Sequence, residues 1–202
     1  MRKLRIIEHI SLDGVIQSPG GPDEDADDFP YGGWANPFSD PAVGEMIFAA
    51  HREPFDLLLG RRTYDIWSGH WPKADGSLAN AINAATKYVA THRPESLEWG
   101  PVEDLGRDLA DGVRRIKAKD GPDVILWGSS TLTPLLIQHG LADEVTLIVY
   151  PILLGKGKRI FSGGAAPREL TLVGSTAGSS GVVVNTYGPS GPLRTGSHDD
   201  EG

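Results

Sequence analysis

The sequence predicts an α/β fold with three layers, in which a mixed, mostly parallel central sheet has helices on both faces. Short apolar segments alternate with amphipathic segments over residues 4–140, and this alternation is typical of parallel strands joined by helices. The last apolar segments follow one another with only turns between them, which predicts a C-terminal antiparallel hairpin. No repeat and no linker divides the chain, so we expect one domain.

The length and the charge of the chain limit its class of partner. Its 202 residues suit one domain with a sizeable core. The net charge is −8, but five of the acids lie in residues 23–28 and three lie after Pro189. The rest of the chain is nearly neutral and has no basic stripe, so we expect neither nucleic acid nor an anionic membrane as a partner. With these two classes excluded, we expect the partner to be a small molecule.

Residue counts exclude several kinds of site and location. The absence of cysteine excludes a disulfide framework, a thiolate zinc site and a cysteine nucleophile. The six histidines are scattered without ligand spacing, so no metal site is expected. The N-terminus lacks the features of a signal peptide, and no window reaches the roughly 18 apolar residues of a membrane span. We therefore expect a soluble, cytoplasmic protein.

Gly, Pro and helix-capping residues mark where the first expected elements begin and end. Residues 4–10 predict a strand. Residues 17–39, rich in Gly, Pro and Asp, predict a long loop, which at this length is usually functional or disordered. Asp40 before Pro41 is a typical helix start, and the helix is expected to run to about Arg52.

The remaining elements continue the alternation. Further strands are expected at 55–59, 87–91, 123–127 and 144–154, and further helices at 61–67, 77–85, 103–117 and from 128–131 to 140. Glu103 and Asp104 are placed in the first turn of the third of these helices, where acids complement the helix dipole. Segments 170–173 and 182–187 form the predicted hairpin. The domain then spans 1–188, and the tail 189–202 is expected to be disordered.

Two strand-to-helix turns carry the chemistry. One is Gly60-Arg61-Arg62-Thr63 and the other is Gly128-Ser129-Ser130-Thr131. Such turns present unpaired N–H groups and the positive end of a helix dipole, and Gly lets a ligand approach the backbone. Two of them fit a diphosphate held between two helix starts. Ordinary helix capping is the alternative.

A third segment, Thr91-His92-Arg93, follows the next strand. Its arginine is suited to a further phosphate, such as the 2′-phosphate of NADPH. A solvated loop arginine is the alternative. No complete P-loop, three-glycine dinucleotide turn or serine nucleophile elbow is present.

Four motifs occur in order along the chain: Ser-Leu-Asp-Gly at 11–14, the first turn at 59–64, the second turn at 127–132, and a Gly-Lys-Gly-Lys segment within 151–161. Together they resemble the dihydrofolate-reductase-like family that includes the C-terminal reductase domain of RibD, the riboflavin-biosynthesis enzyme. The resemblance covers about residues 3–188. It implies a dihydrofolate-reductase-like fold and NADPH as the hydride donor.

The resemblance also implies roles for the three segments. Gly60, Arg61, Arg62 and Thr63 would meet the cofactor phosphates at one helix start, and Gly128, Ser129, Ser130, Thr131 and Leu132 would meet them at the other. Thr91, His92 and Arg93 would lie near the adenosine ribose and its 2′-phosphate. These roles agree with those derived from turn chemistry alone.

By this resemblance, Asp13 and Glu45 are the candidate catalytic residues, and Asp13 and Gly14 are also candidates for binding the substrate. Asp13 is expected to donate a proton or to orient the substrate, although Asp13-Gly14 is also a common turn pair. Glu45 lies on the expected helix about where dihydrofolate reductases keep the carboxylate that binds the pterin. A buried carboxylate there would have a raised pKa and could supply a proton, whereas an exposed helix glutamate is the alternative.

Other residues are candidates for the substrate pocket. Trp34 and Phe38 in the long loop could stack on a flat heterocycle, or pack within the loop. Gly155, Lys156 and Gly157 could shape the far wall, or only form a bulge.

The sequence thus predicts an NADPH-dependent reductase that transfers a hydride to a small heterocycle, resembling 5-amino-6-(5-phosphoribosylamino)uracil reductase. Dihydrofolate reductase activity and a non-catalytic NADPH-binding or sensing protein are the alternatives. A homodimer is expected from the family resemblance and the apolar strand at 145–154.

Overall fold

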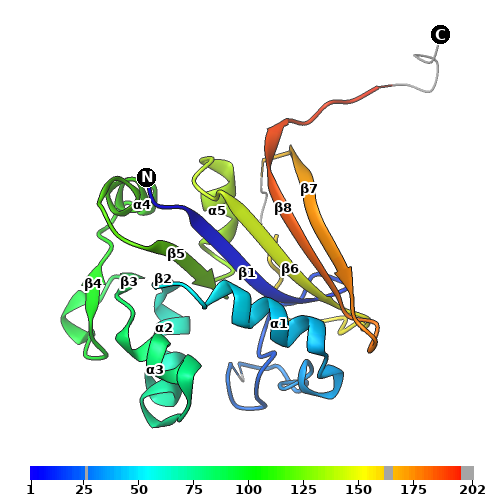
Figure 1. The fold of residues 1–202 in the computed structure, drawn as a ribbon, viewed down its shortest axis with the longest axis horizontal. Coiled ribbons are helices and arrows are strands. Elements are labelled where there is room, and N and C mark those ends of the chain that lie inside the picture. Colours follow the sequence, from blue (N-terminus) through cyan, green and yellow to red (C-terminus); the bar gives the residue numbers. More distant parts are fainter. Residues whose placement is uncertain (26, 162–165, 197–202) are drawn as a thin grey trace.

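A computed structural model describes residues 1–25, 27–161 and 166–196. In this part of the chain, eight strands form one sheet in the order β4-β3-β2-β5-β1-β6-β8-β7 (Figure 1). The strands are β1 Leu4–Ser11, β2 Phe55–Gly60, β3 Lys87–Ala90, β4 Val102–Asp104, β5 Asp123–Trp127, β6 Glu144–Tyr150, β7 Arg168–Ala177 and β8 Val183–Pro192. The pairs from β4 to β6 are parallel and the last two pairs are antiparallel. The predicted mixed sheet with a C-terminal hairpin is confirmed.

Helices cover both faces of the sheet, as predicted. They are α1 Pro41–Ala50, α2 Arg61–His70, α3 Ser77–Ala84, α4 Leu109–Ala118 and α5 Thr133–Gln138, with short 3-10 turns at Asn36–Phe38, Trp71–Lys73 and Pro94–Ser96. Figure 1 shows α1 lying across the near face in front of β1. Asp40 caps α1 by accepting a hydrogen bond from the Ala42 N–H, as its position before Pro41 predicts.

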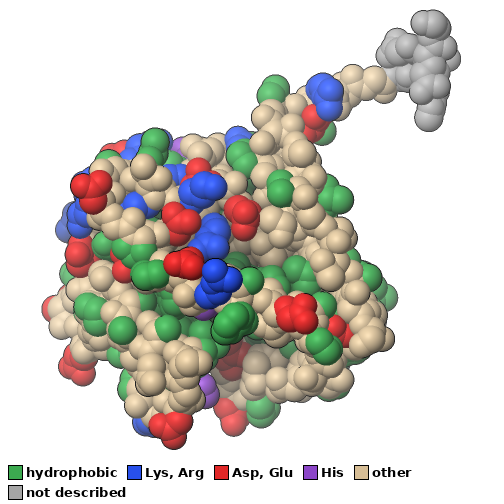
Figure 2. Space-filling view, in the orientation of Figure 1, with side chains coloured by type: hydrophobic (Ala, Val, Ile, Leu, Met, Phe, Trp, Pro, Cys, Tyr) green, Lys and Arg blue, Asp and Glu red, His purple; other side chains and the backbone are tan. Residues whose placement is uncertain are grey.

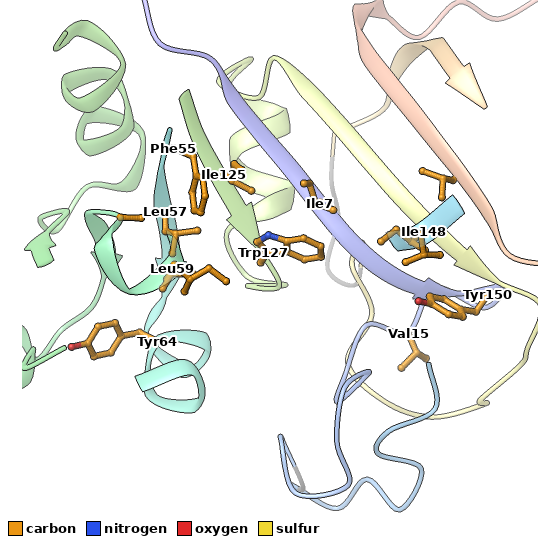
Figure 3. Close-up of a cluster of buried hydrophobic side chains, with 14 of the residues drawn as sticks. Ile7, Val15, Phe55, Leu57, Leu59, Tyr64, Ile125, Trp127, Ile148 and Tyr150 are labelled. Atoms are coloured by element: carbon orange, nitrogen blue, oxygen red, sulfur yellow. The ribbon is translucent and has the colours of Figure 1, made fainter. Parts of the chain in front are cut away.

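Two apolar clusters separate the layers. In β2, Leu57 and Leu59 join the cluster that includes Tyr64 of α2, whereas Leu58 joins the cluster that includes Val113 of α4. This division follows from the period of two in a strand. Figure 3 shows part of the first cluster, with the indole of Trp127 extending from the end of β5 toward β1.

The helix predicted at 103–117 begins six residues later than expected. Glu103 and Asp104 belong to the edge strand β4, and the Leu105 N–H continues that pairing by donating to the Val89 carbonyl. The helix is capped instead by Asp108, whose side chain accepts from the Asp111 N–H. Charge order alone could not distinguish an acidic first turn from an acidic edge strand.

The C-terminal hairpin is longer than predicted. Residues of β8 as far as Pro192 pair with the first residues of β7, so the expected boundary at 188 and the disordered tail from 189 are wrong for this stretch. Arg194 extends the contact through a two-point ion pair with Glu169, at 2.8–2.9 Å. Residues 197–202 lie outside the described residues. The strand expected at 144–154 ends at Tyr150.

The long loop at 17–39 is confirmed and is well packed. Phe29 and Trp34 are buried, and the Trp34 indole N–H donates to the Gln17 carbonyl at 2.7 Å. The buried carboxylate of Asp25 lies 2.7 Å from the Lys158 ammonium. The loop is therefore fastened to the 155–160 segment.

The surface agrees with the charge pattern of the sequence. On the face seen in Figure 2, acidic and basic side chains are interspersed rather than gathered by sign. No helix in the described ranges is long and apolar enough to cross a membrane. The described residues also hold no group of three or more His, Asp or Glu side chains placed to bind a metal ion.

Candidate active site

The two predicted phosphate turns lie side by side at the carboxyl ends of neighbouring strands. Strands β2 and β5 are adjacent and parallel. The chain then leaves β2 through α2 on one face and leaves β5 through α5 on the other. In open α/β sheets, ligands bind in the crevice outside the carboxyl ends of strands where the connections diverge in this way. The topology therefore places the candidate site between Gly60 and Gly128.

A direct contact joins the two turns. The Gly60 N–H donates to the Ser129 hydroxyl at 2.8 Å, and that hydroxyl lies 3.2 Å from the Thr63 hydroxyl. A Cβ at Gly60 would come within 3.1 Å of the Ser129 hydroxyl oxygen, and a Cβ at Gly128 within 3.2 Å of the Thr63 hydroxyl oxygen. The glycines thus let two turns approach that are far apart in the sequence.

The second turn has an unusual backbone. Gly128 has φ +61° and Ser129 has φ +63°, a left-handed conformation that costs a non-glycine residue about 1–2 kcal/mol. Successive N–H groups in such turns form concave anion sites. Ser130 and the exposed Thr131 complete the turn, and the buried Leu132 closes it by donating its N–H to the Ser129 carbonyl at 2.8 Å.

The sequence predicts that both turns open a helix in the same way, but the structure shows two different arrangements. Helix α2 has ten residues and begins directly after Gly60, so its first N–H groups, which have no partner within the helix, lie next to the second turn. Helix α5 has only six residues and begins at Thr133, later than expected. The dipole of so short a helix adds little, and the donors of the second turn are those of the turn itself.

The third predicted segment lies beside the first turn. The Arg61 guanidinium reaches the Arg93 carbonyl at 3.0 Å and the Ser96 hydroxyl at 2.7 Å, and its Nε pairs with Asp65 at 2.8 Å. The Thr91 hydroxyl accepts the Arg93 N–H at 3.0 Å. The side chain of Arg93 is 62% exposed, and its guanidinium lies 3.5 Å from the Asp65 carboxylate. His92 is also exposed. The first and third segments therefore form one polar edge.

Arg62 is engaged by the long loop. Its guanidinium contacts the carboxylates of Asp25 and Asp27, the latter at 2.8 Å. Asp25 thus binds both Arg62 and Lys158, and it ties α2 to the 155–160 segment. The phosphate role of Arg62 stays a prediction, and the acidic residues of the loop supply its present partners.

Several hydrogen-bond donors fix the carboxylate of Asp13 in one position. It accepts hydrogen bonds from the Ser11 hydroxyl at 2.7 Å and from the N–H groups of Leu154 and Gly155 at 3.1 and 2.8 Å. These donors, that of Ser11 foremost, hold the pKa of Asp13 well below its ordinary value. Asp13 is therefore ionised at neutral pH, which favours the orienting role over that of proton donor.

The neighbours of Asp13 are placed by backbone conformation. Gly14 has φ +84° and Gly155 has φ +76°, both in the left-handed region. A Cβ at Gly157 would lie 2.6 Å from Val15 and 2.9 Å from Phe29. The close packing of Gly157 against the long loop explains why a glycine stands there, whether or not the residue also lines the substrate pocket. The neighbouring Lys156 is exposed.

Glu45 does not have the expected environment. Its side chain is exposed on α1, because the helix buries Val43 and half-buries Met46 and Ile47 instead. The hypothesis of a buried carboxylate at this position is wrong, and the exposed alternative holds.

Trp34 is buried and packs edge-on against Tyr150 with ring centroids 5.2 Å apart, and Phe38 packs on the same ring.

Sequence reasoning missed two polar residues of β1. Glu8 is 2% exposed, and burial raises its pKa well above the ordinary value. The signal was present, because Glu8 falls between the inward-facing positions of Ile6 and Ile10 in a strand of period two. His9, on the opposite face, was considered only as a metal ligand.

His9 belongs to a row of rings across three adjacent strands. Its ring stacks with Trp127 at the end of β5, and its Nδ1 is 2.8 Å from the Tyr150 hydroxyl at the end of β6. His51 lies on the other flank, where the Trp127 indole N–H donates to its Nε2 at 3.2 Å. Burial lowers the pKa of His9 to about 4, so the imidazole is neutral at pH 7.

A family model decides the relationship of the chain. The model for the RibD C-terminal domain matches residues 2–184. The chain belongs to the RibD C-terminal domain family. The resemblance seen in the four sequence motifs is therefore confirmed.

Relatives of this RibD-type domain agree in length and fold. An uncharacterised protein of Bacillus subtilis, YyaP, is 26% identical over 183 residues, which cover 88% of this chain and 90% of that protein. A solved structure from Shewanella sp. PV-4, named for riboflavin biosynthesis, has a TM-score of 0.67 and 20% identity, covering 93% of this chain and 99% of that one. The shared fold is dihydrofolate-reductase-like.

A larger neighbour carries a named activity. The Thermotoga maritima diaminohydroxyphosphoribosylaminopyrimidine deaminase/5-amino-6-(5-phosphoribosylamino)uracil reductase has a TM-score of 0.60 and 16% identity. The similarity covers 94% of this chain and 57% of that one. At this identity the likeness concerns the fold of the RibD-type domain.

The contact between the two turns gives a first test of the site. Ser129→Ala should destabilise the protein by about 1–2 kcal/mol, because the buried Gly60 N–H loses its partner. Ser129→Gly loses the same bond but relieves the left-handed strain, so its loss should be smaller. Urea unfolding followed by circular dichroism measures both, with Ser130→Ala as the control. A Ser129→Ala protein as stable as the wild type would contradict the role of this contact.

Asp13 gives a second test through acid stability. Because its folded-state pKa is lowered, its contribution to stability is complete above its unfolded value of about 3.9 and is lost as the pH falls below that value. The stability advantage of the wild type over Asp13→Asn should therefore shrink between about pH 6 and about pH 3. Urea midpoints at the two pH values measure it. The exposed Asp75→Asn is the matched control, and an advantage independent of pH would refute this assignment.

Proposed function

We propose that this chain is an NADPH-dependent reductase that transfers a hydride to a small heterocyclic substrate. The observation that carries the proposal is the contact of the Gly60 N–H with the Ser129 hydroxyl, which unites two glycine turns at the divergence of α2 and α5. Membership of the RibD C-terminal domain family supports the same reading. No comparison identifies the cofactor, so NADPH is part of the proposal.

The donor set fits a dinucleotide. Gly60 and Gly128 lack side chains where the two turns meet, and their own N–H groups are engaged by Ser129 and Glu8. A diphosphate would therefore bind the first N–H groups of α2 and those of the second turn after Gly128. Ser130 and Thr131 add hydroxyl donors at the second turn. Arg93, exposed at the polar edge next to the first turn, would bind the 2′-phosphate, which prefers a guanidinium. Thr91 would orient the loop through its bond to the Arg93 N–H.

The cofactor supplies the hydride chemistry, and the protein supplies orientation and a dry surface. Asp13, ionised and fixed by backbone N–H groups, would orient a donor group of the substrate. The neutral imidazole of His9, with Nδ1 at the Tyr150 hydroxyl, has no Nε2 partner among the described residues. Its Nε2 is therefore available to a hydrogen-bonding atom of the substrate.

The substrate class we favour is a pyrimidine like that in the name of the Thermotoga maritima enzyme. The half-buried His9 ring, which stacks on the buried Trp127, suits a flat heterocycle. Dihydrofolate is the rival substrate, and a protein that only binds NADPH is the rival class. NADPH oxidation measured with the uracil substrate and with dihydrofolate distinguishes these alternatives.

Calorimetric titration with NADPH and with NADH tests the cofactor. The wild type should bind NADPH more tightly, and Arg93→Ala should lose about tenfold of that preference with NADH binding unchanged, because only the 2′-phosphate distinguishes the two ligands. Arg114→Ala is the matched control, since Arg114 is similarly exposed and pairs with Asp111 on α4.

Each alternative has its own result. If the wild type binds neither nucleotide, the reductase proposal is wrong. If it binds NADPH without oxidising it in the presence of either substrate, the protein is a binding or sensing protein. An unchanged preference in Arg93→Ala would leave the cofactor but remove Arg93 from the 2′-phosphate site.

We also propose that the chain forms a homodimer through β7. This strand ends the sheet, and the side chains of Leu172 and Val173 on it are 54% and 67% exposed. An exposed apolar edge strand is a template for pairing. Light scattering at micromolar concentration should give the mass of a dimer, reduced to that of a monomer by Val173→Lys; a wild-type monomer would contradict the proposal. A cytoplasmic location stays a prediction.

A further inference from the structure

Glu8 is a buried carboxyl group directly beneath the second turn. It lies on β1, where the register places Ile7 opposite Trp127 and therefore Glu8 opposite Gly128. Two partners interact with its carboxyl group: the backbone of Gly128 and, across 3.5 Å, the hydroxyl of the fully buried Thr133. One side chain thus spans both ends of the segment from Gly128 to the start of α5.

Among the residues that the structure describes, no charged partner explains the burial of Glu8. Its neighbour on the other strand is Leu147, and α5 contains no ionisable residue. Apart from burial, hydrogen bonds to the Gly128 backbone and the Thr133 hydroxyl shift its pKa, and both lower it. A buried carboxyl group without a cation is costly, and a leucine would satisfy this apolar environment better. The presence of a carboxyl group here needs a reason other than stability.

The Gly128–Ser129 turn next to Glu8 has a strained backbone that other groups must hold in place. Two consecutive residues, Gly128 and Ser129, are left-handed, and such backbone persists only when its surroundings hold it. The Ser129 hydroxyl anchors one side by accepting the Gly60 N–H. Glu8 anchors the other side from beneath.

We propose that Glu8 is a positioning residue, which holds the Gly128–Ser129 turn in the shape that binds the phosphates of a nucleotide. The inference rests on the proposed function, because it assigns Glu8 a purpose only if a phosphate occupies the turn. Glu8 acts through the backbone and touches no ligand.

The protonation state of Glu8 suits this role. Burial raises its pKa well above the ordinary value, which keeps the group neutral over a wider range of pH. A neutral acid can accept from the Gly128 N–H without adding a negative charge behind a bound phosphate. An ionised carboxylate at the same place would repel the ligand through a region of low dielectric.

Calorimetric titration with NADPH separates positioning from packing. Glu8→Gln keeps the shape and an oxygen acceptor, so it should bind NADPH within about threefold of the wild type. Glu8→Leu keeps the volume and suits the apolar surroundings, but it should weaken binding by about tenfold or more because the turn loses its acceptor. Thr146→Val is the control. It removes a buried hydroxyl on β6, the strand that flanks β1 on the side away from the second turn, where Thr146 pairs with Thr186 of β8.

The stability of the ligand-free protein gives a readout independent of binding. Because the folded-state pKa of Glu8 is raised, the folded protein holds this proton longer than the unfolded chain does. The wild type therefore loses stability as the pH rises above about 4.3, whereas Glu8→Gln lacks this loss. The difference in thermal midpoint between Glu8→Gln and the wild type should grow from about pH 5 to about pH 8.

The outcomes distinguish the two proposals. If the wild type fails to bind NADPH, the proposed function itself is wrong. If it binds and Glu8→Leu, shown to be folded by circular dichroism, binds equally well, the positioning role of Glu8 is overturned. Equal loss in Glu8→Gln and Glu8→Leu also overturns it, because the oxygen acceptor then makes no difference.

Discussion

The hydrogen bond between the Gly60 N–H and the Ser129 hydroxyl is the constraint on which the rest of the site depends. It spans 69 residues of sequence and joins strands β2 and β5 at their carboxyl ends. The chain can make it only because both turns contain a glycine at the point of approach and because Ser129 accepts a left-handed backbone. The proposed dinucleotide site depends on this contact.

Other polar contacts support the join from three directions. Glu8 lies beneath the second turn, Arg61 connects the first turn to the Arg93 segment, and Asp25 draws Arg62 toward the long loop. Each of these groups is held by more than one partner. Polar networks of this kind are rigid when they are satisfied, which is how a site preorganises its ligand contacts.

Sequence reasoning reached the fold and the two glycine turns of the proposed nucleotide site because both depend on local signals. Gly60 and Gly128 follow apolar strands, and that pattern alone indicates turns open to the backbone. The substrate side depends on contacts between distant residues, such as Asp13 with Gly155 or His9 with Tyr150. The exposure of Glu45 depends on how α1 rotates against the sheet, and the burial of Glu8 was readable only from its place in the strand.

The ion pairs of Asp25 have a consequence for how this domain can vary among relatives. The carboxylate is buried and neutralises Arg62 on α2 as well as Lys158 beyond the sheet. A shorter or neutral loop would leave two cations facing each other without a counter-ion. We therefore expect a change in the charge of the loop between residues 17 and 39 to require compensating substitutions at 62 and 158.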